Sequence, residues 1–165
     1  MLRALALLAA VVAVFSVAVG GASGINRPLT FSLLEIDESD ASTNLGFDFQ
    51  RGPKPGDQFA FKSGLYKWAG VKRGTRIGYD KGWCTFIQVP TNFQQLWGHC
   101  TAGFFLPGGQ ILAAAFIHFT DGPLNVDVPV IGGNGIYANA RGYVHVHDLG
   151  NGDGGHTSLT FHLLP

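Results

Sequence analysis

The sequence predicts an all-β domain, an eight-stranded antiparallel β-barrel. Glycine is abundant, at 24 residues, and is spread along the whole chain with apolar and β-branched runs between the glycines. This rhythm is typical of short strands joined by turns. After the N-terminal segment, no stretch of about 10 to 12 residues has helical periodicity, so any helices are expected to be short.

Eight segments have the composition of strands, and they lie at 30–37, 58–66, 75–79, 83–89, 96–106, 111–119, 142–149 and 157–164. Clusters of Gly, Pro, Asn and Asp mark turns between them, at 51–56, 80–82, 107–109, 121–123, 132–135 and 151–155. Strands joined mostly by hairpins indicate a barrel or a sandwich, and a closed eight-stranded barrel has room for side chains or one small ligand.

The N-terminal segment has the composition of a secretory signal. Arg3 is its only charged residue, the run 4–19 is apolar, and small residues follow. We therefore assign residues 1–24 to a signal peptide cleaved near Ala22 to Gly24, and expect a secreted, extracellular protein. The alternative is an uncleaved anchor, but the run has about 16 residues whereas a bilayer-spanning helix needs ~20, so no stable membrane insertion is expected.

Residues 25–165 are then one barrel domain of 141 residues, a common size for a single core. The chain has 11 basic and 11 acidic residues, so loss of Arg3 with the leader leaves a formal charge of −1. The basic residues are scattered except for Lys72, Arg73 and Arg76, which we assign to a solvated turn. No nucleic-acid partner is expected.

The two cysteines, Cys84 and Cys100, allow two interpretations. An oxidising compartment favours a disulfide, which would close a loop of about 15 residues and stabilise the fold by ~3 kcal/mol in the chain-entropy model. The alternative is an unpaired Cys84 in the wall of a ligand cavity.

The first predicted strand offers candidate acid–base groups. Alternation places Phe31, Leu33, Glu35 and Asp37 on one face. If that face is internal, two carboxyl groups lie at one end of an apolar barrel, where burial raises at least one pKa. The alternative, which the composition favours, is a solvated strand end at the rim.

Two further strands offer candidate cavity walls. Phe59, Phe61 and Ser63 share a face opposite Lys62, which needs water, so the aromatic face is expected to be internal. Residues 83–89 divide into two sets, and periodicity does not decide which of them faces inward; one contains Trp83, Thr85 and Ile87, the other Cys84, Phe86 and Gln88.

The other motifs do not indicate a cofactor. Tyr143, His145 and His147 share a strand face, but no third metal ligand follows at a characteristic spacing, so we expect exposed histidines and no metal. The glycine-rich segment 132–135 has no helix after it and is assigned to a turn. No nucleophile elbow occurs, so covalent catalysis is not supported.

These segments resemble the allene oxide cyclase and dirigent superfamily over residues 31–164. The most specific piece is Pro-Val-Ile-Gly-Gly-Asn-Gly-Ile-Tyr-Ala-Asn-Ala-Arg-Gly-Tyr at 129–143, which is similar to the glycine turn and Ala-Arg-Gly strand of dirigent-like proteins. Three other pieces look like the cyclase branch: residues 35–38, Phe61 with Leu65 and Tyr66, and residues 82–88. The resemblance implies an eight-stranded antiparallel barrel that steers the cyclisation or coupling of hydrophobic intermediates.

The resemblance also implies site residues. The first-strand motif of plant cyclases is Glu-Ile-Asn, so Glu35 would polarise the substrate and Asp37 would help to hold a water on the epoxide oxygen. The implied catalytic residues are Glu35, Asp37, Ser63 and Cys84, and the implied substrate-binding residues are Phe59, Phe61, Phe86 and Arg141. Since Cys84 matches a cavity-wall position of the cyclases and Cys100 has no counterpart in their pattern, the resemblance slightly favours an unpaired Cys84 over the disulfide. Arg141 matches the dirigent arginine, for which a structural role at the barrel mouth is the alternative.

This chain departs from the family patterns at three positions. Asp37 and Ser63 replace amides of the cyclase pattern, and Ile136 stands where many dirigent proteins have Asp.

Two functions follow from these observations. One is a cofactor-free cyclase or isomerase that folds a small hydrophobic substrate in its interior. The other is a non-catalytic, dirigent- or lipocalin-like binding barrel. Strands that are apolar on both faces, together with the resemblance, also lead us to expect a homo-oligomer, a dimer or a trimer.

Overall fold

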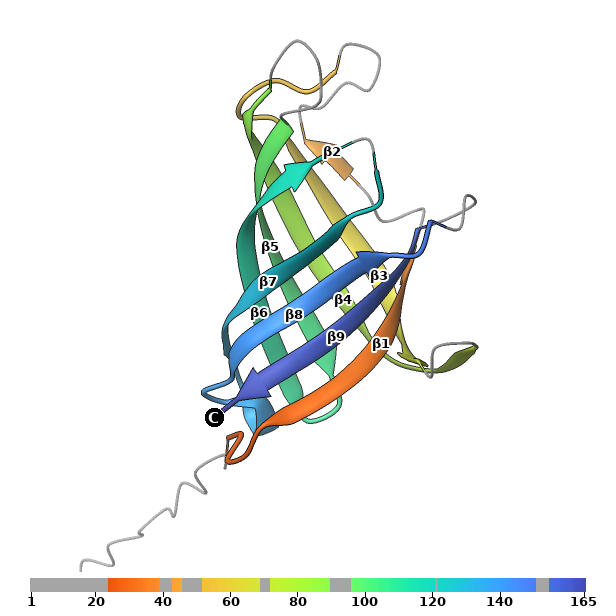
Figure 1. The fold of residues 1–165 in the computed structure, drawn as a ribbon, viewed down its shortest axis with the longest axis vertical. Helices are drawn as coiled ribbons and strands as arrows, with labels where there is room; N and C mark the ends of the chain where they lie inside the picture. Colours follow the sequence, from red (N-terminus) through yellow and green to blue (C-terminus); the bar gives the residue numbers. More distant parts are fainter. Residues whose placement is uncertain are drawn as a thin grey trace, which may run out of the picture.

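The computed structural model is a closed antiparallel β-barrel of eight strands (Figure 1), as the sequence predicts. It describes residues 24–38, 43–45, 52–68, 72–89, 96–120, 122–150 and 155–165. The barrel strands are β1 (Leu29–Asp37), β3 (Gln58–Trp68), β4 (Arg73–Gln88), β5 (Leu96–Leu106), β6 (Gly109–Phe119), β7 (Asn125–Gly133), β8 (Arg141–Asp148) and β9 (His156–Leu164). A short strand, β2 (Thr43–Leu45), and a 3-10 helix, η1 (Gly135–Tyr137), complete the described elements.

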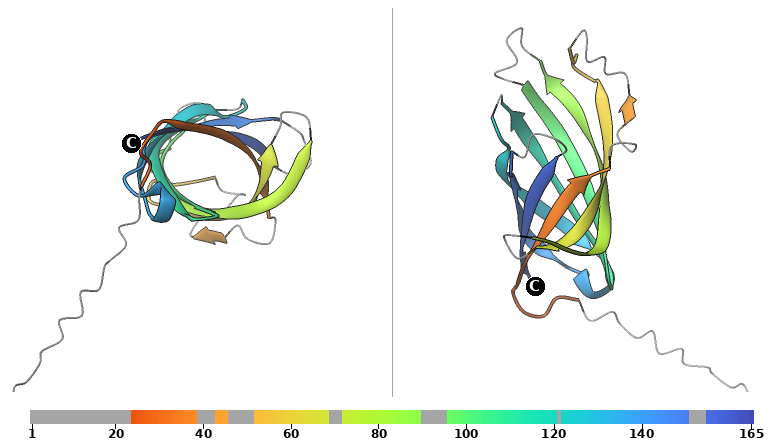
Figure 2. Two further views of the ribbon diagram at one scale, coloured as in Figure 1. Left: turned by 90° about the horizontal axis from the view of Figure 1, so that it is seen from below. Right: turned by 90° about the vertical axis from the view of Figure 1, so that its right-hand side faces the viewer.

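Each strand from β3 to β9 pairs with its neighbours in sequence, and β1 closes the ring by pairing with both β9 and β3. The closed ring is seen along its axis in the left view of Figure 2. β1 pairs with residues 63–67 of β3, and β2 pairs with residues 58–60 on the same edge of β3. Closure satisfies the backbone groups that an open sheet would leave at its edges.

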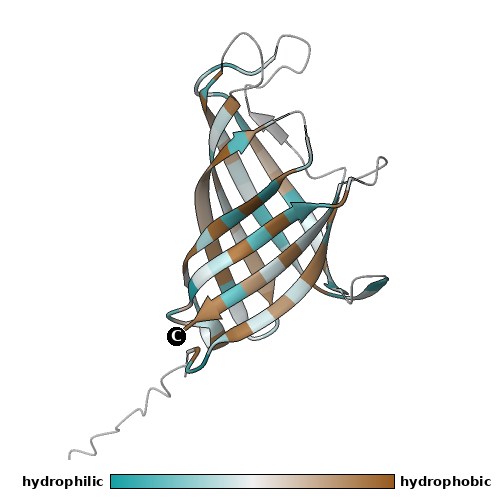
Figure 3. Ribbon diagram, in the orientation of Figure 1, coloured by the Kyte–Doolittle hydropathy of each residue, from teal (hydrophilic) through white to brown (hydrophobic). Residues whose placement is uncertain are grey.

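Hydropathy alternates along the strands (Figure 3), because successive side chains point into and out of the barrel. On β6, for example, Ile111 and Ile117 are buried whereas Leu112 and Phe116 are exposed. Large side chains fill the end of the barrel beside η1. There, Phe161 is fully buried, and its ring lies 4.7 Å from that of Phe31 and 5.0 Å from that of Phe104, centroid to centroid.

The turn predicted at 80–82 is wrong, because these residues lie inside the continuous strand β4. Asp80 is only 1% exposed and pairs with Ser63 on β3 and Phe104 on β5. Gly82 is opposite Phe61, whose ring fills the space that a Cβ at residue 82 would need. A buried aspartate and a glycine facing a phenylalanine ring therefore give a strand the composition of a turn.

β7 is missing from the predicted strands. The predicted number of eight is still correct because the sequence predicts β4 as two strands, 75–79 and 83–89, and this extra strand offsets the missing β7. Pro129 lies within β7 and pairs with Tyr143 on β8. The ladder between β6 and β7 reaches only residues 130–133 of β7, so the missing N–H of Pro129 costs no bond to β6.

The predicted leader falls mostly on residues 1–23, which lie outside the described residues, so export remains a prediction. In the part of the chain that the structure describes, no helix is long and apolar enough to span a membrane.

Cys84 and Cys100 form a disulfide, and the preference for an unpaired Cys84 is wrong. The two residues are directly opposite each other on β4 and β5, and both side chains face the barrel interior. The two sulfur atoms meet because the register between β4 and β5 aligns the two residues, and the alternation of residues along each strand does not predict that register.

Apolar side chains also lie on the outer face of the barrel. Phe116 and Leu112 on β6, Trp83 on β4 and Ile131 on β7 are all more than two fifths exposed, Phe116 the most at 65%. The ring of Phe116 lies 5.0 Å from that of His99 on the intervening strand β5. Exposed apolar side chains of this kind are typical of interaction surfaces, and the homo-oligomer stays a prediction.

We expect the disulfide to stabilise the fold substantially. The bond closes a segment with a sequence separation of 16, for which the loss of loop entropy in the unfolded chain is worth about 3 kcal/mol. The double variant Cys84→Ala/Cys100→Ala should lose about that much free energy of unfolding in urea titrations. Thiol titration of the unfolded, non-reduced wild-type protein should find no free thiol, and two reactive thiols would contradict the bond.

We also expect the outer face of β4 to β7 to mediate self-association. Purified protein at tens of micromolar should sediment as a dimer or trimer, and Phe116→Glu should shift it toward the monomer because a charge would be buried in the interface. His147→Glu, an exposed position on the outer face of β8, is the matched control and should leave the assembly unchanged. A wild-type monomer at these concentrations would rule out the interface.

Candidate active site

Strand register assembles a cluster of polar side chains. Asp37 on β1, Ser63 on β3 and Asp80 on β4 are level with one another across three neighbouring strands. Glu35 precedes Asp37 by two residues and therefore points to the same side of the sheet. The sequence identified three of these four residues. It missed Asp80, although a continuous strand through residues 80–82 would have placed Asp80 on the same face as Cys84.

The hydroxyl of Ser63 connects two carboxyl groups. Its Oγ lies 3.0 Å from Oε1 of Glu35 and 3.0 Å from Oδ1 of Asp37, and its backbone N–H donates to Oδ1 of Asp80 at 3.0 Å. A hydroxyl has one proton, so a full hydrogen bond to each carboxyl requires that one of them be protonated and donate to the serine oxygen. The geometry thus favours a cluster that holds at least one proton.

Burial explains why that proton is retained. Removal from water raises the pKa of Glu35 well above its usual value, and repulsion from Asp80 adds to this, while the hydrogen bond from Ser63 acts in the opposite direction. Burial likewise raises the pKa of Asp80, from 3.8 to about 6, against the lowering effect of its hydrogen bonds with Glu35 and with backbone N–H groups. The hydrogen bond between these two side chains lets one proton serve both carboxyl groups.

Glu38, three residues beyond Glu35, provides a contrast outside the barrel. It forms ion pairs with Lys62 and Arg76, and the hydrogen bond from Lys62 lowers the pKa of Glu38. The same stretch of chain therefore has carboxyl groups of opposite character, set by the side of the barrel wall on which each one lies.

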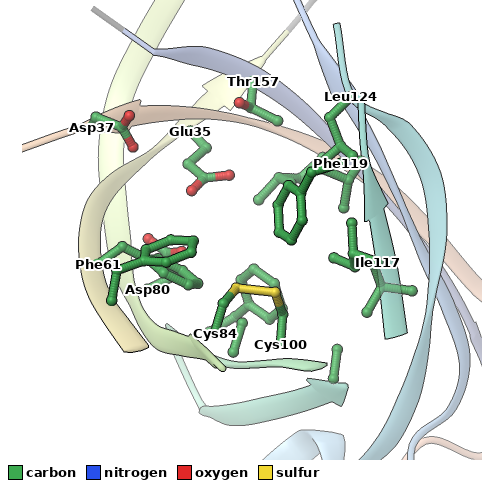
Figure 4. Close-up of a pocket in the computed structure, with 17 residues that line it drawn as sticks. Glu35, Asp37, Phe61, Asp80, Cys84, Cys100, Ile117, Phe119, Leu124 and Thr157 are labelled. Carbon is green, nitrogen blue, oxygen red and sulfur yellow. A yellow bond between two sulfur atoms is a disulfide. The ribbon is translucent and has the colours of Figure 1, made fainter. Parts of the chain in front are cut away.

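The carboxyl cluster lies on one wall of a cavity of about 260 Å³. In Figure 4 the carboxyl group of Glu35 points into this space, with Ile117 and Phe119 on the far side and the disulfide at its base. The other walls are apolar and come from Phe59, Phe61, Cys84, Cys100, Ala102, Phe104, Ala113, Ile117, Phe119, Leu124, Val128, Val146 and Leu159, with Thr157 beside Glu35. The site is therefore a small apolar chamber with its acid groups on one side.

The predicted binding residues divide into three groups. Phe59 and Phe61 line the cavity, as the outward position of Lys62 indicates. Phe86 is buried behind them, its ring 5.6 Å from that of Phe59, and supports the wall. Arg141 is not brought together with the cluster: it lines a separate surface hollow, and its Nε donates to the main-chain oxygen of Pro165 at 3.0 Å.

The structure also shows where the candidate reactive residues Cys84 and His145 lie. Cys84 lies in the cavity wall, but its sulfur is bonded to Cys100, so no thiol faces the cavity and the candidate catalytic role of Cys84 becomes a structural one. His145 lies on the outer face of β8, where its Nδ1 is 2.7 Å from Oδ1 of Asp127. Across the described ranges, no group of three or more His, Cys, Asp or Glu side chains is arranged to hold a metal ion.

Comparison with solved structures supports the barrel assignment. A pyocyanin demethylase is similar over 79% of this chain and 98% of its own, with 26% identity and a TM-score of 0.59. The Diels–Alderase AbmU from Streptomyces koyangensis is similar over 84% of this chain, which spans 65% of the enzyme's length, with 19% identity and a TM-score of 0.64. A pterocarpan synthase dirigent protein is similar over 84% of this chain and 94% of its own, with 12% identity and a TM-score of 0.60.

The two more distant matches, at 19% and 12% identity, show a shared fold. Neither a scan of protein families nor a search of curated proteins finds a match to the sequence.

The raised pKa of Asp80 predicts how stability depends on pH. The folded state binds this proton more tightly than the unfolded chain, so the contribution is complete below about pH 4 and is lost as the pH rises through about 6. A shift of about two pKa units corresponds to about 3 kcal/mol, and Glu35 adds a dependence of the same sign. We expect urea titrations of the wild-type protein to show stability falling between pH 4.5 and 7.5.

Asp80→Asn should flatten that dependence, because the amide resembles the protonated acid and still accepts from the backbone of Ser63. Asp57→Asn, in a turn on the outside of the barrel, is the matched control and should keep the wild-type dependence. Parallel curves for the wild type and Asp80→Asn would show that Asp80 does not hold the proton.

Proposed function

We propose that this barrel is a cofactor-free enzyme of the cyclase or isomerase type, which binds a small, largely apolar molecule in its cavity and moves a proton with Glu35 and Asp80. The observation that supports this most is a pair of carboxyl groups, the buried one of Asp80 and the half-buried one of Glu35, on the wall of an otherwise apolar chamber. Carboxyl groups with raised pKa values are suited to acid–base catalysis near neutral pH.

The geometry suggests a role for each polar residue. Glu35 reaches into the cavity and is the group that contacts the substrate, either donating or accepting the proton. Asp80 lies behind it and shares the proton, so the pair can offer one acid and one base at the same time. Ser63 fixes the orientation of both, through its hydroxyl and its backbone N–H.

The walls would contribute through shape. Four phenylalanine rings and a set of aliphatic side chains restrict the conformations of a bound molecule, which lowers the entropy lost on reaching a ring-forming transition state. A cavity of about 260 Å³ is near the lower end of small-molecule sites, which begin at about 300 Å³, so a substrate of roughly drug-fragment size is expected.

The names of the similar structures are consistent with this proposal. A Diels–Alderase forms rings, which is the reaction class proposed here, and the demethylase and the dirigent protein show that similar barrels also serve other chemistry. The alternative for this chain is a binding barrel without turnover, for which buried carboxyl groups would only add a desolvation cost.

We further propose that the domain works outside the cytoplasm as a secreted protein. Two independent features support this: the signal-like composition of residues 1–24 and the disulfide between Cys84 and Cys100, since disulfides persist in oxidising compartments.

Proton-transfer competence can be tested with 5-nitrobenzisoxazole, a planar apolar probe of suitable size. Removal of its C3 proton by a base breaks the N–O bond and gives the isomeric cyanophenol, whose absorbance is followed. We expect the wild-type protein to accelerate this isomerisation, with a rate that rises with pH as the buried carboxyl groups ionise. Glu35→Gln should lower the rate about 100-fold, the usual contribution of a general base.

Asp57→Asn is the matched control and should retain the wild-type rate. Probe binding, followed separately by fluorescence quenching, should survive in Glu35→Gln. Binding without acceleration in the wild type would favour the non-catalytic barrel over the enzyme.

A further inference from the structure

The cavity has an unbalanced charge. Among the described residues that line it are three carboxyl groups and no lysine, arginine or histidine. The groups that face Glu35 are Asp37 on its own strand, Ser63 on β3, Asp80 on β4 and Thr157 on β9, while β5 to β8 contribute only apolar side chains. A negative cluster in a chamber of low dielectric attracts a positive charge and repels a negative one.

The nearby cations are held on the outside of the barrel. Lys62 on β3 and Arg76 on β4 both pair with Glu38. Lys81 on β4 lies over the ring of Tyr79, with its Nζ 5.5 Å from the ring centroid. Lys62 and Lys81 are each adjacent in sequence to a member of the cluster, so alternation directs their side chains away from the cavity. Arg76 lies beyond a register shift between β3 and β4, where it pairs with Glu38. Among the described residues, none supplies a positive charge inside the cavity.

The apolar walls of the cavity are rich in aromatic rings, with Phe61 beside Asp80 and Phe119 on the far side from Glu35 (Figure 4). Phe59 lies 6.3 Å from Phe61 and 6.5 Å from Phe119, centroid to centroid, and Phe104 also lines the space. Ring faces attract cations, and flat apolar walls suit a flat ligand. A purely hydrocarbon ligand would leave the negative charge of the ionised carboxyl groups unbalanced, whereas a compact planar cation would complement both the charge and the aromatic walls.

We propose that the ligand of this cavity is a planar aromatic cation, such as a protonated or N-alkylated nitrogen heterocycle of two or three rings, bound between the carboxyl cluster and the phenylalanine rings. This inference rests on the proposed function only in taking the cavity as the substrate site. The positive charge faces Glu35 and Asp80, and its arrival releases the proton that these two groups share.

Three probes of nearly the same shape test the charge preference: 1-methylquinolinium, 1-methylnaphthalene and 1-naphthoate. At pH 8, calorimetry should show the cation binding at least about tenfold more tightly than the neutral hydrocarbon, with no measurable binding of the anion. The preference should disappear by pH 4.5, where the carboxyl groups are protonated. At pH 6, titrations in buffers of different ionisation enthalpy should detect proton release with the cation alone.

The variant Glu35→Gln/Asp80→Asn should bind the cation and the hydrocarbon about equally, and Asp57→Asn should keep the wild-type preference. If the double variant does not fold, the pH dependence of the wild type decides the question alone. Equal binding of the two probes at pH 8, or no binding of the cation at roughly 1 mM, overturns the proposal.

Turnover separates the two proposals. Isomerisation of 5-nitrobenzisoxazole without a preference for the cation would support the enzyme proposal and contradict the proposal that the ligand is a planar aromatic cation. A preference for the cation without isomerisation would do the reverse.

Discussion

The register of three neighbouring strands is the constraint on which the rest of this structure depends. Because β1, β3 and β4 pair antiparallel around a closed ring, Asp37, Ser63 and Asp80 become level and face inward. If either pairing slipped by one residue, the inward-facing side chains of the shifted strand would turn outward, and its apolar side chains would be exposed to water. The hydrophobic pattern that defines the barrel therefore also fixes the acid cluster, without any dedicated loop.

The two ends of the barrel are packed differently around that cluster. At one end, the rings of Phe31, Phe104 and Phe161 pack against one another in the barrel interior. At the other, the side chains are smaller or line the walls, and a cavity remains. In the part of the chain that the structure describes, no buried side-chain nitrogen or oxygen lacks a hydrogen-bond partner. The carboxyl groups thus satisfy one another through Ser63 and a retained proton, a state that a ligand with its own charge or proton can change.

The cavity wall also contains the disulfide, which ties β4 to β5 at the base of the cavity in the close-up of Figure 4. This bond fixes the spacing of the strand that provides Asp80 and the strand that provides Phe104. The bond that stabilises the fold is therefore the same bond that shapes the floor of the site, which suits a small domain whose interior is partly hollow.

The sequence by itself determined the fold class, the inward position of Phe59 and Phe61 and the shared face of Glu35 and Asp37, because alternation is a local property that survives in any sheet. It did not reveal β7 or the continuity of β4, since Pro129, Asp80 and Gly82 are turn-forming residues whose strand conformation depends on neighbours distant in the chain. Only the tertiary structure decided that Cys84 meets Cys100, that Asp80 joins Glu35 and that Arg141 lies elsewhere. Those facts depend on which residues of different strands are level, and register is set by the closure of the whole barrel rather than by any single segment.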